Sequence, residues 1–187
     1  TLLHIIQPFV SETYAYYKWR ILLHRTTAVA NQSHEVKYWC LKESTMECTV
    51  RWLGSESGMA FVAETGSNHA LVMDGAPDAG GRNIAPRPME LLLAGTGGCT
   101  AFDVVLILKR GRHQVTGCDV SLTAERAEAD PKVFTSIHFH YRIRGKQLKP
   151  EAVARAIDLS KDKYCSASIM VGKTASITHD FEIIEDL

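Results

Sequence analysis

The sequence predicts a mixed fold in which short strands precede one long, apolar helix. Residues 47–53, 59–64 and 69–74 have strand length and are separated by turn residues, which suggests an antiparallel meander. A loop rich in glycine and proline follows over residues 75–87, and residues 89–109 are then almost entirely apolar over a helical length. A helix that is apolar on all sides is typical of a core, so this segment is predicted to be buried at the centre of the fold.

Local signals support each element of this prediction. In the first strand, Cys48, Val50 and Trp52 alternate onto one face. Pro88 suits the first turn of the long helix and Gly111 suits its end. The three glycines at 95, 97 and 98 each lower the helical propensity by about 1 kcal/mol relative to alanine. That cost needs a reason, and we expect the small residues to allow a close approach by another segment and to leave room around the neighbouring cysteine.

The second half of the domain continues with two longer strands at 115–124 and 133–144. A helix over 151–163 follows, opened by Pro150, and residues 175–184 alternate as a last strand. The apolar stripe of this second helix consists of Val153, Ala156, Ile157 and, one turn later, Ser160.

The first 45 residues differ in composition from the rest. They are rich in aromatic and histidine side chains, contain no glycine and show no strand alternation. We therefore interpret residues 46–187 as the domain and residues 1–45 as an N-terminal extension of doubtful origin, such as an over-extended reading frame. The alternative is a helix near 11–29 that packs on the domain.

Composition and charge narrow the class of protein. The chain has 187 residues, enough for one domain with a sizeable core, and 21 basic residues balance 21 acidic ones. This balance argues against nucleic acid or an anionic membrane as a partner. We expect no membrane-spanning segment and no signal peptide, because charged residues interrupt the apolar runs. The expected compartment is the cytoplasm.

Five cysteines carry the functional interpretation: Cys40, Cys48, Cys99, Cys118 and Cys165. Their number is odd and no CxxC pair occurs, so neither a zinc ribbon nor a thioredoxin motif is indicated, and free thiols are expected. Cys99 and Cys165 would meet if their helical segments cross. A thiol that reduces peroxides needs a second thiol to resolve its sulfenic acid, which such a pair supplies. The alternative is that cysteines act as small core residues, as we expect for Cys48 and Cys118 on their strands.

Two motifs favour the reactive cysteine pair over cysteines that are merely core residues, because the motifs resemble those of a known family. The run PRPMELLLAGTGGC at 86–99 and the run KYCS at 163–166 resemble the OsmC/Ohr superfamily, most closely its YhfA-like, OsmC-related branch. The resemblance covers residues 46 to about 185. It implies an α+β fold with antiparallel sheets around a long buried central helix, and an intertwined homodimer with active sites at the subunit interface.

The resemblance also implies a cysteine-based peroxidase that acts in oxidative-stress defence. Cys99 matches the peroxidatic cysteine that reduces organic hydroperoxides, and Cys165 matches the resolving cysteine. A dithiol, such as a lipoyl group, would recycle the disulfide. No metal, flavin or other cofactor is expected.

Departures from the family pattern concern the groups that activate the cysteine. The family glutamate falls on Met89 here, and Glu90 lies one residue later, about 100° further around the helix. The first hairpin turn lacks the family arginine, for which Arg82 and Arg87 are candidate substitutes. These departures favour a second hypothesis, in which a non-catalytic dimer binds a small hydrophobic ligand at its interface.

Three further side chains have alternative readings. Asp103 shares a helix face with Cys99 and needs a partner in so apolar a helix. In the structural interpretation, the Asp103 carboxylate forms a salt bridge or a cap to another element. In the functional interpretation, it serves the site as a proton acceptor or as the partner of an arginine. His138 and His140 alternate onto one strand face and are interpreted as a solvated face rather than a metal site.

Overall fold

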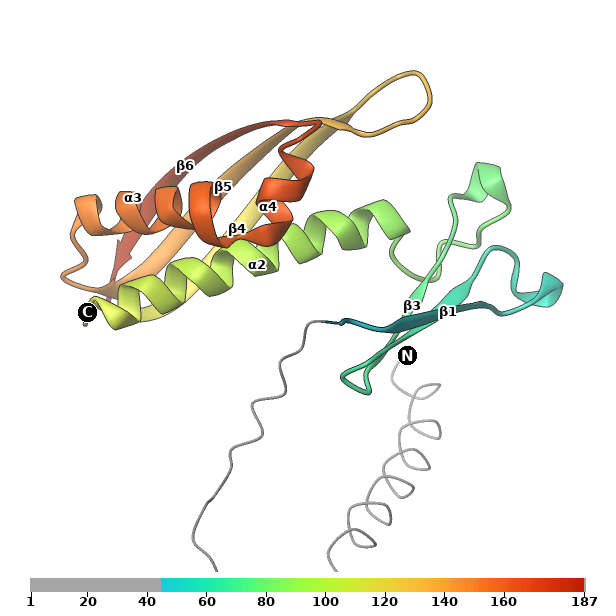
Figure 1. Cartoon of the computed structure of the whole chain (residues 1–187), viewed down its shortest axis with the longest axis horizontal. Coiled ribbons are helices and arrows are strands. Elements are labelled where there is room, and N and C mark those ends of the chain that lie inside the picture. The colour runs from blue at the N-terminus through green and yellow to red at the C-terminus, as the bar shows by residue number, and fades with distance from the viewer. Residues whose placement is uncertain (1–44, 187) are drawn as a thin grey trace, which may run out of the picture. The chain divides into compact units, whose positions relative to one another are not determined.

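The computed structural model describes residues 45–186, which form one unit of the chain (Figure 1). The extension, with the helix expected near 11–29, lies outside the described residues. The strands are β1 (Cys48–Trp52), β2 (Phe61–Thr65), β3 (Ala70–Met73), β4 (Gln114–Arg126), β5 (Phe134–Lys146) and β6 (Ser176–Glu185). The helices are α2 (Pro88–Arg110), α3 (Pro150–Leu159) and α4 (Ser166–Val171), with the short turns η1 (Ser55–Ser57), η2 (Pro77–Ala79) and η3 (Ser160–Tyr164).

The predicted meander is confirmed as an antiparallel sheet in the order β1–β2–β3. The indole N–H of Trp52 donates to the carbonyl of Gly58 at 2.7 Å and so fixes the turn that joins β1 to β2. The expectation that Cys48 faces a core is wrong for the single chain, because every residue of β1 is exposed. The alternating face of this strand has no covering layer among the described residues.

The long helix α2 begins and ends where the sequence predicts. Pro88 occupies its first turn, Glu90 accepts a hydrogen bond from the backbone N–H of Arg87 at 2.8 Å as part of a capping box, and Gly111 is the C-cap. Only one face is buried in the chain, and it is formed by Thr96, Gly97, Thr100, Val104 and Leu108. Burial on all sides is therefore not achieved within one chain, and Leu92 and Phe102 on other faces remain exposed.

A membrane-spanning segment was not expected, yet α2 has the length and hydropathy of one. The core helix of a globular protein meets the same criterion. Here α2 packs on β4, and a Cβ atom at Gly97 would lie 2.6 Å from Cδ1 of Leu122. The expectation that the glycines allow a close approach by another segment is thus confirmed at Gly97. Gly95 and Gly98, in contrast, face open space among the described residues.

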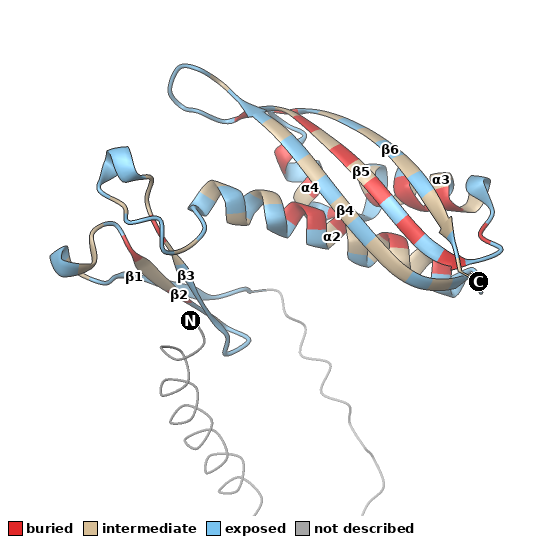
Figure 2. Ribbon diagram, turned by 180° about the vertical axis from the view of Figure 1, so that it is seen from behind, coloured by how far each residue is buried: buried red, intermediate tan, exposed pale blue. Residues whose placement is uncertain are grey.

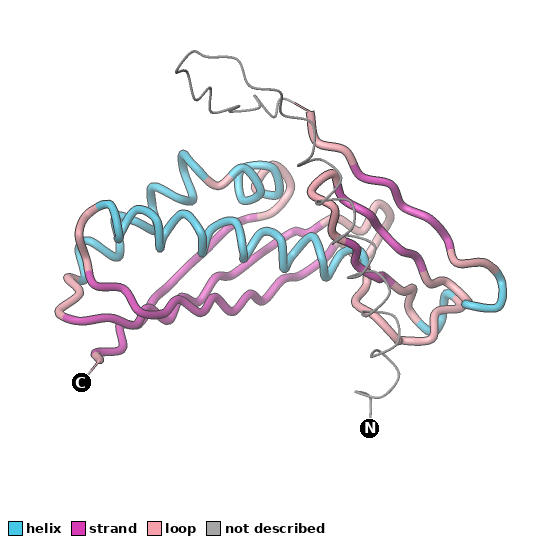
Figure 3. The backbone as a smooth tube through the Cα atoms, turned by 90° about the horizontal axis from the view of Figure 1, so that it is seen from below, coloured by secondary structure: helices cyan, strands magenta, loops and turns pink. Residues whose placement is uncertain are grey.

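The second sheet has the order β4–β5–β6, with helices packed on one face (Figure 3). β4 and β5 are antiparallel, but β6 runs parallel to β5, so the prediction of wholly antiparallel sheets needs this correction. The physical reason is the connection: α3, η3 and α4 form a crossover that returns the chain in its original direction. Buried and exposed residues alternate along β5 (Figure 2), with Ile137, Phe139 and Ile143 in the core.

The segment after β5 differs from the predicted helix over 151–163. The stripe of Val153, Ala156, Ile157 and Ser160 is confirmed, because all four are fully buried. The α-helix stops at Leu159, however, and η3 continues it as a π-turn in which the N–H of Cys165 donates to the carbonyl of Ser160 at 2.8 Å. Such turns are rare and often occur at functional sites. This one places Cys165 opposite α2.

Candidate active site

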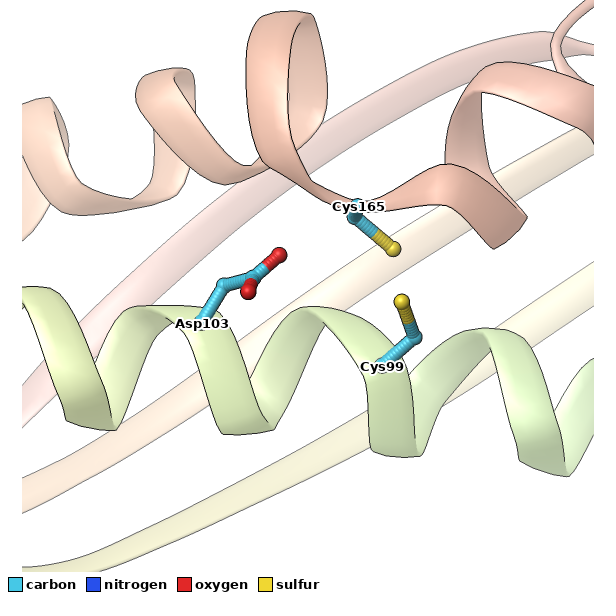
Figure 4. Close-up of side chains that lie close together, drawn as sticks. All are labelled: Cys99, Asp103 and Cys165. Carbon is cyan, nitrogen blue, oxygen red and sulfur yellow. The ribbon is translucent and has the colours of Figure 1, made fainter. Parts of the chain in front are cut away.

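Cys99 and Cys165 face one another across two elements that are far apart in the sequence. Cys99 lies on α2, and Asp103 follows one turn later on the same face (Figure 4). Cys165 ends η3 and caps α4. Both Sγ atoms and one carboxylate oxygen of Asp103 lie within 4.8 Å of one another. Both cysteines are free thiols, so the structure holds the pair in its reduced form.

Cys165 is the more enclosed of the two thiols. It is fully buried, and its Sγ accepts hydrogen bonds from the Oγ of Ser168 at 3.1 Å and from the N–H of Ser168 at 3.4 Å. Burial raises the pKa of Cys165, and the neighbouring Cys99 adds to this rise, whereas the hydrogen bonds from Ser168 oppose it. The Cys165 thiol is therefore protonated at neutral pH, and the hydrogen bonds from Ser168 already hold its sulfur in place.

Asp103 has a hydroxyl partner, rather than the salt bridge or cap that the sequence suggested as its structural role. The Oγ of Ser160 donates to Oδ2 of Asp103 at 3.2 Å. Ser160 also lies 2.9 Å from Oγ1 of Thr100, which lies 2.8 Å from the hydroxyl of Tyr141. These four side chains form a continuous hydrogen-bonded chain that leads from the sheet to the cysteine pair.

The direction of each hydrogen bond among these four side chains follows from the number of protons that each can donate. A carboxylate only accepts, and each hydroxyl has one proton to donate. Ser160 therefore donates to Asp103, Thr100 donates to Ser160, and Tyr141 donates to Thr100. Burial raises the pKa of Tyr141 to about 12, which keeps its donating proton in place. Each hydroxyl in this series therefore donates to the next side chain in the direction of Asp103.

The other predicted site residues lie elsewhere in the chain. Glu90 is exposed and caps the start of α2, nine residues from Cys99, a rise of about 14 Å along a helix. The guanidinium of Arg82 donates to the carbonyl of Glu56 at 3.4 Å, and Arg87 is the N-cap residue of α2. Within the described residues, no recorded hydrogen bond or ion pair joins any of these three to either cysteine.

His138 and His140 lie on the outer face of the second sheet. Nδ1 of His138 is 2.8 Å from Oγ1 of Thr178, and Nδ1 of His140 is 2.5 Å from Oδ1 of Asp180. The hydrogen bond from His140 is the main cause that lowers the pKa of Asp180. These contacts support the interpretation of a solvated, charged face.

Sequence reasoning missed the hydroxyl chain. Ser160 was recognised only as part of a helical stripe, and Thr100 and Tyr141 were not singled out. A polar residue in a fully apolar stripe was the available signal, since a buried hydroxyl needs a partner. Their meeting depends on the π-turn and on the packing of α2, and neither follows from local pattern.

Comparison with known proteins identifies the family. The model of the OsmC family, described as OsmC-like protein, matches residues 80–180. This chain belongs to the OsmC-like family. Protein YhfA of Escherichia coli K12 is 45% identical to this OsmC-like chain over 139 residues, which are 74% of the chain and 98% of YhfA. The resemblance to the YhfA-like branch is thereby confirmed.

Solved structures agree with the OsmC-like fold. A structural-genomics protein is 43% identical with a TM-score of 0.68, covering 75% of this chain and 100% of its own. A hypothetical protein from Aquifex aeolicus is 28% identical with a TM-score of 0.65, and the match covers 76% of this chain and 98% of the Aquifex chain. An organic hydroperoxide resistance protein from Elizabethkingia anophelis shares the fold at 15% identity and a TM-score of 0.58, covering 75% and 96%.

Proposed function

We propose that this OsmC-like protein reduces organic hydroperoxides through the pair Cys99 and Cys165, as part of a defence against oxidative stress in the cytoplasm. The observation that carries the proposal is the approach of the two free sulfurs to within 4.8 Å. Hydroperoxide resistance in the names of structural neighbours from Elizabethkingia anophelis and Legionella pneumophila supports the same chemistry.

The reaction proceeds in three balanced steps. The Cys99 thiolate attacks the terminal oxygen of the hydroperoxide, the O–O bond breaks, and the alcohol leaves after its oxygen takes up a proton. The Cys165 sulfur then attacks the resulting sulfenic acid, which releases water and forms a disulfide. An external dithiol, such as a lipoyl group, reduces the disulfide by exchange and is itself oxidised to a cyclic disulfide.

Within this reaction, we assign Asp103 the role of proton acceptor for the Cys99 thiol. It is the carboxylate that lies beside both sulfurs, and the hydroxyl chain through Ser160 holds it there. Glu90 is occupied in capping α2. Arg82 and Arg87 are exposed, so we propose that they contribute to peroxide binding only through a second copy of the chain.

We propose that this second copy forms a homodimer across the uncovered apolar faces. Phe102 is 67% exposed and Leu92 is 45% exposed on α2, beside Gly95 and Gly98, which face open space. Contiguous apolar exposure of this kind marks an interaction surface. Phe102→Glu is expected to give a monomer in sedimentation, whereas Ser121→Glu, which adds the same charge on the outer face of β4, should remain dimeric. A monomeric wild-type chain would refute the homodimer.

The test of the proposed function measures hydroperoxide consumption with dihydrolipoamide as reductant. Cumene hydroperoxide should be consumed faster than hydrogen peroxide. Cys99→Ser should abolish the activity, and Cys165→Ser should accumulate a sulfenic acid on Cys99 that dimedone traps. Cys118→Ser and Cys48→Ser are matched controls that should retain activity. A folded wild-type protein that consumes no hydroperoxide with any dithiol would refute the proposal.

A second candidate function rests on an apolar groove between α2 and β4. Its volume is about 490 Å³, and Phe102, Val105 and Leu106 line it together with Val115 and Cys118. Neither Cys99 nor Cys165 lines this groove, so a small hydrophobic ligand bound there would leave the pair accessible. Binding of such a ligand without any peroxide reduction would favour this non-catalytic role.

A further inference from the structure

We propose that the reduced site binds a thiophilic divalent cation, Zn²⁺, through the sulfurs of Cys99 and Cys165 and a carboxylate oxygen of Asp103. The resemblance to the family predicts no metal, so the inference rests on the geometry of this chain. The three donor atoms lie within 4.8 Å of one another and come from two elements that the core holds together.

The donor set and its spacing suit zinc. In a tetrahedral site with Zn–S bonds of about 2.3 Å, two sulfurs lie about 3.8 Å apart, so small side-chain rotations close the present spacing. Cys99 and Asp103 are one helical turn apart on α2, a spacing that directs two ligands to the same side. Three protein ligands leave the fourth position for water.

Two of the three ligands already accept hydrogen bonds from neighbouring serines. Ser160 donates to Oδ2 of Asp103, which leaves the other carboxylate oxygen for the ion. Ser168 donates to the sulfur of Cys165 through both its N–H and its hydroxyl. Outer-shell partners of this kind orient metal ligands and stabilise their charged forms.

Charge and access are consistent with a cation. Binding converts both thiols to thiolates and releases two protons to solvent, and the dication then offsets two of the three negative charges. Cys99 and Asp103 are half-buried rather than enclosed, so an ion can reach them from solvent. Thiolate donors select zinc and other soft ions over Mg²⁺ and Ca²⁺, which prefer oxygen. An ion on both sulfurs and a disulfide between them exclude one another.

The test is titration of the fully reduced, full-length chain with Co²⁺, followed by displacement with Zn²⁺. We expect one Co²⁺ per chain, with sulfur-to-cobalt charge-transfer bands and the visible bands of a tetrahedral ion, both abolished by one equivalent of Zn²⁺. Absence of the charge-transfer bands would overturn the proposal.

Variants test each ligand separately. Cys99→Ser and Cys165→Ser should each reduce the charge-transfer intensity by about half and weaken binding. Asp103→Asn keeps the size and the hydrogen bond from Ser160, and it should weaken binding by about tenfold or more, at least as much as loss of an outer-shell partner. Circular dichroism confirms that each variant is folded. Unchanged affinity in Asp103→Asn would overturn the three-ligand site.

A matched control removes the other cysteines. A chain with Cys40→Ser, Cys48→Ser and Cys118→Ser retains Cys99 and Cys165 as its two remaining cysteines and should bind Co²⁺ as the wild type does. Loss of the signal in this chain would place the ion elsewhere.

The metal site does not depend on the peroxidase activity. A chain that binds Co²⁺ through the pair but consumes no hydroperoxide refutes the peroxidase alone. A chain that consumes hydroperoxide but shows no thiolate-bound Co²⁺ refutes the metal site alone. If both are present, one equivalent of Zn²⁺ added to the pre-reduced chain in the absence of free dithiol should block the single turnover in which hydroperoxide oxidises the pair, because the attack needs a free Cys99 sulfur.

Discussion

Replacing Ser160 with alanine tests the oriented hydroxyl chain that holds Asp103 beside the cysteine pair. Ser160 is fully buried and is the link between Thr100 and Asp103. Alanine has nearly the same volume, so the change removes two hydrogen bonds while creating little cavity. It also leaves the Thr100 proton without its acceptor and Asp103 without its donor.

The expected cost follows from the two contacts. A hydrogen bond to a charged group contributes about 1.5–3 kcal/mol, and the 3.2 Å contact to Asp103 is long for a hydroxyl donor, which favours the lower end. The 2.9 Å contact to Thr100 is neutral and contributes about 1 kcal/mol. We therefore expect Ser160→Ala to lower the free energy of unfolding by about 2.5 kcal/mol.

Urea denaturation at one fixed protein concentration measures this change, since the stability of the proposed homodimer would depend on protein concentration. With a slope of about 2–3 kcal/mol per molar urea, the midpoint should fall by about 1 M. Ser136→Ala is the matched control. Ser136 donates to Glu125 at 3.0 Å, the same serine-to-carboxylate bond but on the solvated face, and its loss should cost about 0.5 kcal/mol or less. Equal costs for the two variants would refute the reasoning.

Three other changes have expected outcomes. Gly97→Ala should lower the free energy of unfolding by about 1–3 kcal/mol, although alanine favours a helix over glycine, because its Cβ would lie 2.6 Å from Cδ1 of Leu122; an unchanged or higher unfolding midpoint would contradict the close packing of α2 on β4. Burial raises the pKa of Cys118 from 9.0 to about 11, so the unfolded chain loses this proton at a lower pH than the folded chain does. The free energy of unfolding should therefore decline as the pH rises from about 9 to about 11, and Cys118→Ala should lack this part of the decline. Tyr141→Phe should cost about 1 kcal/mol at pH 7 and should then lose less stability than the wild type between pH 10 and 12, over which the raised pKa of Tyr141 predicts a decline; parallel pH profiles would argue against its buried hydroxyl.

Much of the fold was predictable because local patterns set the type of each element. Alternation identified the first strand, strand length between turn residues identified the next two, and Pro88 and Gly111 bounded α2 correctly. The stripe ending at Ser160 identified the buried face of α3. These signals are local: side-chain period distinguishes helix from strand, and residues with restricted or unusual backbone preferences end them.

The candidate site was predictable only in part. The motifs around Cys99 and Cys165 selected the pair from five cysteines, and the structure brings their sulfurs together. Glu90 was a candidate site residue because of its position in the motif. In the structure it caps a helix, since an acidic residue in the third position of a helix satisfies free backbone N–H groups.

The sequence alone determined which segments are strands and helices and to which family the chain belongs, and it singled out Cys99 and Cys165 as the candidate pair. Only the tertiary structure decided that β6 lies parallel to β5, that a π-turn presents Cys165 to α2, and that Ser160 connects Tyr141 and Thr100 to Asp103. The physical reason is that periodicity states which face of an element is apolar, but not which partner covers it. Contacts between distant segments arise from packing, and the site is built entirely from such contacts.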